Sequence, residues 1–147
     1  MSMVMEAMPW EVDDLARAGA AYGRVTVCRL DAPPVSDTFA RVQPGDCLVL
    51  EAPGPDDAQE LWSCPGQPRT RRLDLAAARD VALTAGLTVH DCGQWRTRYL
   101  FIDAAAAIAF VEEAWWLPDP LPSLGTHRGP ITATASRFYL VASRPAE

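Results

Sequence analysis

The sequence predicts a single α/β domain. Segments with the alternating or continuous apolar pattern of strands are separated along the chain by segments with apolar residues at helical spacing. Alternation of this kind is typical of a layered α/β fold. The chain has 147 residues, of which 49% are hydrophobic, so one domain can bury a core. We therefore expect one folded unit over residues 1–147.

The first half of the chain contains two expected strands. Residues 11–22 carry apolar side chains at helical spacing, and Gly23 ends this helix. Residues 24–30 alternate between apolar and polar side chains, as a strand does. A short helical turn is expected over 36–41. Residues 46–52 form a continuous apolar run, which is typical of a strand that is buried on both faces.

Two helices are expected next. Residues 53–62 combine proline and acidic residues before apolar ones, which is typical of a helix N-terminus. Residues 73–86 form the second helix. We expect Asp74 to cap its start and Gly86 to terminate it.

The last third of the chain predicts a strand, a helix and a strand. In the strand over 87–101 we expect a bend or a bulge at Gly93. Asp103 caps an apolar helix over 104–117, and residues 131–143 form a long alternating strand. The helix is apolar on more than one side, so we expect more than one of its sides to be covered.

Composition excludes several classes of function. The net charge of −6 argues against non-specific nucleic-acid binding. Glu112 and Glu113 interrupt the longest apolar stretch, so no membrane span is expected. The first residues lack the positive charge of a signal peptide, and we expect a cytoplasmic protein. The four cysteines are then reduced, and because they form no CxxC pair, we expect no metal site.

Several short motifs follow one another in a recognisable order. They are RVQPGDCLVLEA (41–52), AGLTV (85–89), Phe101 and Asp103 before the apolar helix, Trp115 and Pro118 at its end, Ser136–Phe138, and Arg144 with Pro145. Together they cover about residues 41–145 and resemble the C-terminal half of class I S-adenosylmethionine-dependent methyltransferases of the bacterial small-molecule type.

This resemblance implies a truncated Rossmann-like three-layer sandwich with a mixed sheet of about four strands. The implied strand order is 24–30, 46–52, 131–143, 87–101, with an unpaired edge at 24–30. The glycine-rich turn that holds the cofactor in this family is absent, and too few residues precede the matching region to form the cofactor-binding half. We therefore expect a methyltransferase-like pseudoenzyme that uses no cofactor.

The function expected from this resemblance is association. The edge over 24–30 would pair with a second copy or with another subunit, in small-molecule biosynthesis. The absence of lysine, with all 13 basic residues being arginine, suggests a GC-rich genome such as that of an actinobacterium. Two alternatives stay open: a cofactor-independent isomerase or cyclase with an aromatic pocket, and one half of a split methyltransferase. The sequence does not decide whether catalysis occurs.

The candidate site residues are two possible acid–base groups and an aromatic set. His127 lies on a proline-rich loop and is the best general-base candidate, with Tyr99 assisting. A pocket for a small apolar ligand would be lined by Trp95, Phe101, Trp115 and Trp116, with Tyr99. The same aromatic residues could equally form an ordinary core.

Overall fold

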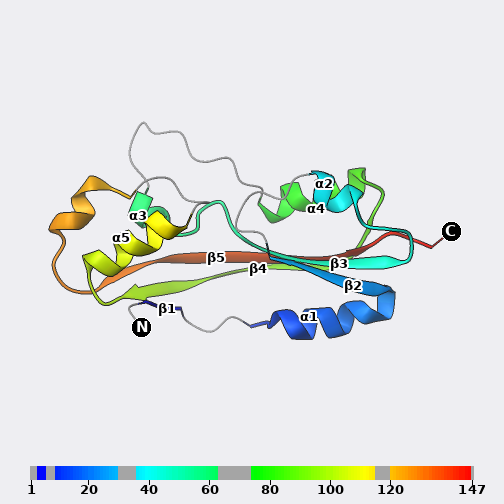
Figure 1. Ribbon diagram of the computed structural model, residues 1–147, viewed down its shortest axis with the longest axis horizontal. Coiled ribbons are helices and arrows are strands. Elements are labelled where there is room, and N and C mark those ends of the chain that lie inside the picture. The colour runs from blue at the N-terminus through cyan, green and yellow to red at the C-terminus, as the bar shows by residue number, and fades with distance from the viewer. Residues whose placement is uncertain (1–2, 6–8, 30–35, 63–73, 115–119, 147) are drawn as a thin grey trace.

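The chain folds around one open mixed sheet (Figure 1). The computed structural model describes residues 3–5, 9–29, 36–62, 74–114 and 120–146. The strands are β1 (Met3–Met5), β2 (Arg24–Arg29), β3 (Asp46–Pro53), β4 (Thr88–Phe101) and β5 (Ile131–Ser143). Their order is β1-β4-β5-β3-β2. β2 runs parallel to β3, whereas the other neighbouring strands are antiparallel.

The predicted order of the four longer strands is confirmed, with β2 at one edge and β3, β5 and β4 following. A fifth strand, β1, was not predicted. It pairs with the far end of β4, so β4 is not the second edge over that stretch. Three residues are too few to show a strand period, and only the presence of Tyr99–Phe101 alongside reveals the pairing.

The helices cover both faces of the sheet. They are α1 (Val12–Gly19), η1 (Ala20–Tyr22), α2 (Ser36–Ala40), α3 (Gln59–Trp62), α4 (Leu75–Thr84), α5 (Ala104–Glu113) and η2 (Pro122–Thr126). Figure 1 shows α1 on one side of the sheet and α2 with α4 on the other. α3, α5 and η2 gather at the end where β4 and β5 extend beyond β3 (Figure 1). The result is an α/β sandwich.

Local sequence signals position the two longer helices of the second half. The carboxylate of Asp74 accepts a hydrogen bond from the Ala77 amide at 2.8 Å, and Asp103 accepts one from Ala106 at 2.9 Å. Both predicted caps are confirmed. Gly86 follows α4 with φ of +88°, which the missing side chain permits. α5 ends at Glu113, before the predicted end at residue 117.

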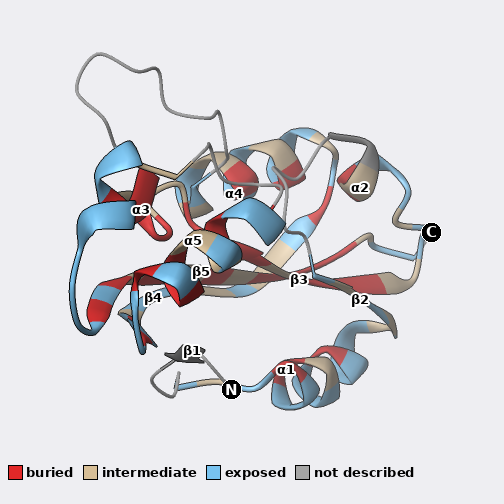
Figure 2. Ribbon diagram, turned by 60° about the vertical axis from the view of Figure 1, so that its left-hand side comes forward, coloured by how far each residue is buried: buried red, intermediate tan, exposed pale blue. Residues whose placement is uncertain are grey.

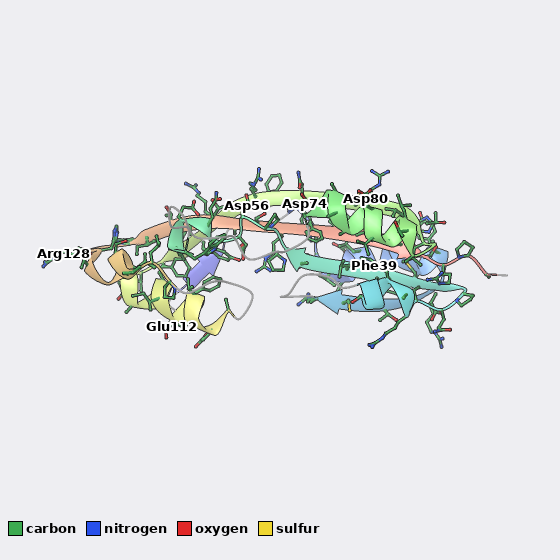
Figure 3. All side chains as sticks on the ribbon, turned by 90° about the horizontal axis from the view of Figure 1, so that it is seen from above. Phe39, Asp56, Asp74, Asp80, Glu112 and Arg128 are labelled. Atoms are coloured by element: carbon green, nitrogen blue, oxygen red, sulfur yellow. The ribbon has the colours of Figure 1, made fainter. Side chains whose placement is uncertain are left out.

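The core divides into clusters on the two faces of the sheet (Figure 2). Alternate residues of β5 separate between them: Phe138 and Leu140 pack with α2 and α4, whereas Val141 packs with α1. Phe39 of α2 is fully buried in the first of these clusters (Figure 3). At the far end, Val111 of α5 belongs to a third cluster, with α3 and the ends of β4 and β5.

The bulge in β4 lies at His90, between Val89 and Asp91, so the prediction of a bulge at Gly93 is wrong. Gly93 stays in regular register opposite Tyr139. A Cβ atom at Gly93 would lie 2.6 Å from Cε1 of the Tyr139 ring. The glycine therefore makes room for an aromatic ring, and the backbone there stays regular.

The predicted helix over 53–62 is wrong for its first half, because only Gln59–Trp62 is helical. The segment before it takes over the edge of β5 where β3 ends. Gly54 N donates to Ser136 O at 2.9 Å, and Ala58 N donates to Thr134 O at 2.7 Å. The exposed strand edge is thereby closed.

Two carboxylates complete this closure. Ser136 N donates to Oδ1 of Asp57 at 2.9 Å, and Thr134 N donates to Oε1 of Glu60 at 2.9 Å. Side-chain oxygens thus replace the carbonyl acceptors that a neighbouring strand would supply. This arrangement fixes the chain that leaves β3 against β5, and it positions Asp56 beside Arg96 of β4.

Candidate functional site

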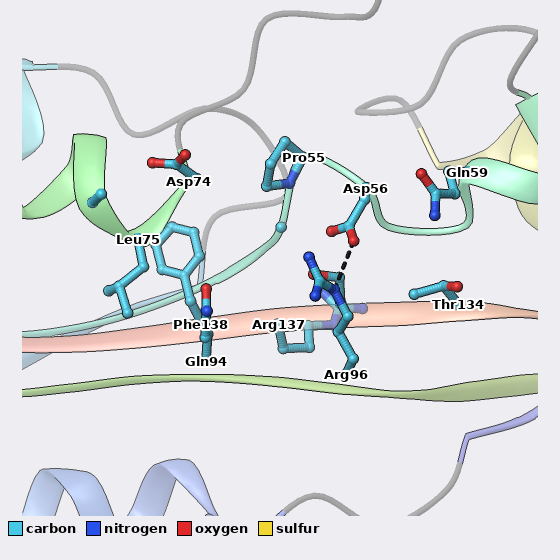
Figure 4. A pocket seen from close by; sticks show the side chains of 13 residues that line it. Pro55, Asp56, Gln59, Asp74, Leu75, Gln94, Arg96, Thr134, Arg137 and Phe138 are labelled. Carbon is cyan, nitrogen blue, oxygen red and sulfur yellow. Dashed lines mark hydrogen bonds and ion pairs between the residues drawn. The ribbon is translucent and has the colours of Figure 1, made fainter.

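A polar cavity of about 680 Å³ opens beyond the carboxyl end of β3 (Figure 4). It lies between the segment 54–59, the first turn of α4, and one face of β4 and β5. Its lining side chains include Asp56, Gln59, Asp74, Gln94, Arg96, Thr134, Ser136 and Phe138. Open α/β sheets commonly bind ligands beyond the carboxyl ends of their strands, and volumes of this size suit small molecules.

An ion pair stands at the centre of the cavity wall. Nε of Arg96 donates to Oδ2 of Asp56 at 2.8 Å (Figure 4). The Asp56 side chain is 13% exposed, whereas that of Arg96 is 71% exposed, so most of the arginine side chain faces solvent. Partial burial alone would raise the pKa of Asp56. Hydrogen bonds from Ser136 and Arg96, and the charge of Arg96, outweigh burial and lower this pKa.

Behind the cavity lies a second, buried polar network. Asp57 is fully buried, and its carboxylate accepts hydrogen bonds from the Tyr99 hydroxyl at 2.9 and 3.2 Å. Nη2 of Arg137 donates to the same hydroxyl oxygen at 3.0 Å. The Trp62 indole donates to the Asp57 carbonyl at 2.7 Å. The network joins the segment after β3 to both long strands.

Both titratable partners of Asp57 are stabilised in their protonated forms. Burial, followed by the charge of Asp57, raises the pKa of Tyr99 well above its usual range. Burial would lower the pKa of Arg137, but its contact with the Tyr99 hydroxyl and the negative charges of Asp57 and Glu51 outweigh burial and raise this pKa. A buried tyrosine held in this way is a structural donor, and it is poorly suited to transfer protons to a ligand in the cavity.

The aromatic residues singled out from the sequence lie in different environments. Tyr99 and Phe101 are each 1% exposed, and their rings pack against Phe110 of α5 with centroid distances of 4.8 and 5.4 Å. Trp95 shares their side of β4 by alternation but is 43% exposed. Tyr99 and Phe101 thus contribute to the core at the end of the sheet. Trp115 and Trp116 lie outside the described residues.

His127 lies on the exposed turn after η2. Its Nε2 is 3.3 Å from the Pro130 carbonyl oxygen, and it lines no part of the cavity. Within the described ranges, no group of three or more histidine, cysteine or acidic side chains is arranged to hold a metal ion. No helix in this part of the chain is long and apolar enough to span a membrane.

A second surface of interest is the outer edge of β2, which is the last strand of the sheet among the described residues. Val27 of this strand is 42% exposed. Arg24 pairs with Asp46 of β3 in register and forms an ion pair with it, Nε to Oδ1, at 3.5 Å. Arg29 stands in register with Glu51. Each basic residue of the edge therefore has an acidic neighbour within its own sheet.

Sequence reasoning missed the polar cavity. The run PGPDD at 53–57 was interpreted through helix-dipole preferences, whereas Asp57 completes a strand edge and Asp56 faces Arg96. A position directly after a buried strand was the available signal, since such positions gather at the carboxyl edge of a sheet. The pairing with Arg96 joins residues 40 positions apart, which spacing cannot reveal.

Comparison with known proteins supports the fold alone. No family model matches the sequence, and no curated protein matches it. A crystal structure of a functionally unknown protein from Deinococcus radiodurans R1 is similar to this chain, with a TM-score of 0.50 and 10% sequence identity. The similarity covers 82% of this chain and 49% of that chain. The chain thus spans about half the length of that structure.

Proposed function

We propose that this chain is a methyltransferase-like protein that acts by association, as a homodimer formed through the outer edge of β2. The observation that carries the proposal is that, within the described part of the chain, β2 ends the sheet with an exposed side chain at Val27. An open edge offers unpaired backbone donors and acceptors to another strand. A second copy of β2 satisfies them and extends the sheet across both chains.

The charges of the edge are compatible with a second copy. Arg24 and Arg29 would repel a copy of the same strand if they were unbalanced. Each stands beside an acidic residue of β3, Asp46 and Glu51 respectively, so the local charge is largely compensated. This balance removes the main electrostatic barrier to self-pairing.

The geometry of an antiparallel ladder also permits self-pairing. In an antiparallel ladder, two residues that lie opposite one another are either both hydrogen-bonded to each other or both not. A two-fold axis that relates two copies of β2 therefore passes through one such pair, in which a residue lies opposite its own copy. Residues an odd number of positions apart then never face each other, and Arg24 does not meet Arg29. With Thr26 on the two-fold axis, Val27 stands opposite Val25 of the second copy. Such β-branched pairs stabilise sheets.

The proposed biological role is that of a cofactor-independent partner or pseudoenzyme in small-molecule biosynthesis. The methyltransferase relationship, with its Rossmann-like character, stays a prediction from the sequence motifs. The split-methyltransferase and the isomerase or cyclase hypotheses also stay predictions.

The experiment is to introduce a charge at the proposed interface. Val27→Arg places a guanidinium in the aliphatic pair of each copy, and we expect it to convert the dimer to a monomer. Leu83→Arg is the matched control, because Leu83 is an exposed residue of α4, 49% accessible, away from the edge. Light scattering measures the native mass of both variants. A V27R protein that stays dimeric would contradict the β2 interface.

A further inference from the structure

We propose that the cavity beyond β3 binds a small zwitterion, with a carboxylate held by Arg96 and an ammonium group held by Asp74. The proposal is independent of the proposed dimer, because the cavity lies beyond the carboxyl end of β3 and does not involve β2. It rests on the charges that line the two sides of the cavity, on their existing hydrogen bonds, and on the space between them.

Arg96 supplies the anion-binding end. Its Nε is held by Asp56, which fixes the orientation of the planar guanidinium. The side chain is 71% exposed, so its remaining N–H groups are accessible from the cavity. Asp56 is itself held by Ser136. A guanidinium oriented by a half-buried partner is well suited to a carboxylate, which it can bind through two parallel hydrogen bonds.

Asp74 supplies the cation-binding end. Its Oδ1 accepts the Ala77 amide, which fixes the carboxylate at the start of α4 while the residue stays exposed. Figure 4 shows Asp74 across the cavity from the pair formed by Asp56 and Arg96. Asp74 precedes α4 and Arg96 lies on β4, so the two charged groups come from separate elements. Figure 3 shows Asp56 and Asp74 at neighbouring positions along the long axis of the molecule.

The balance of charge favours a ligand that carries both signs. Asp56, Asp74 and Arg96 contribute two negative charges and one positive charge to the lining. Arg137 also borders the cavity, but its guanidinium donates to Tyr99 in the buried network. With Arg137 counted, the lining carries two negative and two positive charges. A simple anion would leave the charge of Asp74 uncompensated by the ligand, whereas an added amine compensates it.

The middle of the cavity suits a short chain between the two charges. Gln59, Gln94 and Thr134 offer hydrogen-bonding side chains, and Leu75 and Pro55 offer apolar surface (Figure 4). A volume of about 680 Å³ accommodates a ligand of amino-acid size or somewhat larger. The ligand class is therefore an amino acid whose amine and carboxylate are separated by a short chain.

Isothermal titration calorimetry tests the proposal with four probes on the full chain. γ-Aminobutyrate and ε-aminocaproate carry both charges, whereas hexanoate and hexylamine each carry one. We expect at least one zwitterion to bind saturably, with one site per chain, and about tenfold more tightly than either single-charge analogue. Equal binding of hexanoate and the zwitterions, or saturable binding of none of the four, would overturn the proposal.

Two variants then locate the site. Arg96→Gln and Asp74→Asn are each expected to weaken zwitterion binding by about tenfold or more. Asparagine keeps a capping oxygen for α4, so the second variant preserves the helix start. Arg79→Gln and Asp80→Asn remove the same charges from exposed positions of α4 and should bind as the unmodified chain does. Undiminished binding by folded R96Q or D74N protein, checked by circular dichroism, would contradict the assignment.

Discussion

The hydroxyl of Tyr99 donates to the buried carboxylate of Asp57 at 2.9 Å, across 42 positions of the sequence. Asp57 also accepts the Ser136 amide, which would otherwise be unpaired at the edge of β5. One carboxylate thus joins β4, β5 and the segment after β3. Asp56 directly precedes Asp57 in the chain and lines the polar cavity. The contacts of Asp57 therefore also fix the position of one cavity wall.

Removing the Tyr99 hydroxyl should destabilise the fold. Tyr99→Phe takes a donor from a fully buried carboxylate, and we expect a loss of about 1–3 kcal/mol in the free energy of unfolding. Urea denaturation measures this loss. Tyr139→Phe is the control, since its hydroxyl bonds to Asp91 in an exposed contact and its loss should cost clearly less. Equal losses in the two variants would show that the burial of Asp57 does not increase the contribution of this hydrogen bond to the free energy of unfolding.

Gly54 should tolerate no side chain. A Cβ atom there would collide with Oγ of Ser136, the residue whose backbone carbonyl accepts the Gly54 amide at the closed β5 edge. We expect Gly54→Ala to lower stability by about 1–3 kcal/mol, as overpacking does. Gly125→Ala is the matched change, because nothing lies within 4 Å of a Cβ at Gly125. Thermal melting of both variants measures this difference. Similar melting temperatures for the two variants would contradict a collision between the Gly54 position and Ser136.

Glu60 should act as an acceptor more than as a charge. Its two oxygens accept from the amide and the hydroxyl of Thr134, at 2.9 and 2.7 Å. Glu60→Gln keeps one acceptor and should cost less than about 0.5 kcal/mol, whereas Glu60→Ala loses both acceptors of an exposed contact and should cost about 0.5–1.5 kcal/mol. Chemical denaturation of the pair checks this order. A glutamine variant as unstable as the alanine variant would mean that the charge dominates.

The stability contributed by Asp56 should depend on pH. Its pKa is lowered below the ordinary value of 3.8, so the folded chain binds this proton less readily than the unfolded chain. Its contribution is therefore full above the unfolded pKa and is lost as pH falls through the folded pKa. Asp56→Asn should be less stable than the unmodified chain at neutral pH, and the difference should shrink as pH falls below 3.8 and through the lowered folded pKa. A difference that is constant with pH would contradict this assignment.

The sequence predicted the central strands because each is long enough to show its period. The continuous apolar run of β3 and the alternation of β5 identified both strands, and the resemblance supplied their order. Asp74 and Asp103 were predicted because a cap acts within three residues of its own position. These features depend on local chemistry, which a single sequence displays.

The features that failed depend on distant partners. PGPDD resembles a helix start, but the Asp57 carboxylate accepts the backbone amide of Ser136, 79 positions away. Alternation placed Trp95 on the same side of β4 as Tyr99, yet alternation does not reveal which part of a sheet is covered. The cavity likewise depends on Arg96 reaching Asp56, which becomes visible only once β4, β5 and the segment after β3 are adjacent.

The native mass of the purified chain at tens of micromolar is the most direct test of the proposed association. Light scattering should give about twice the chain mass of 16.0 kDa, unchanged when S-adenosylmethionine is added. The expected dimer should be lost in the Val27→Arg variant. A stable mass of 16.0 kDa for the unmodified chain would contradict self-pairing through β2.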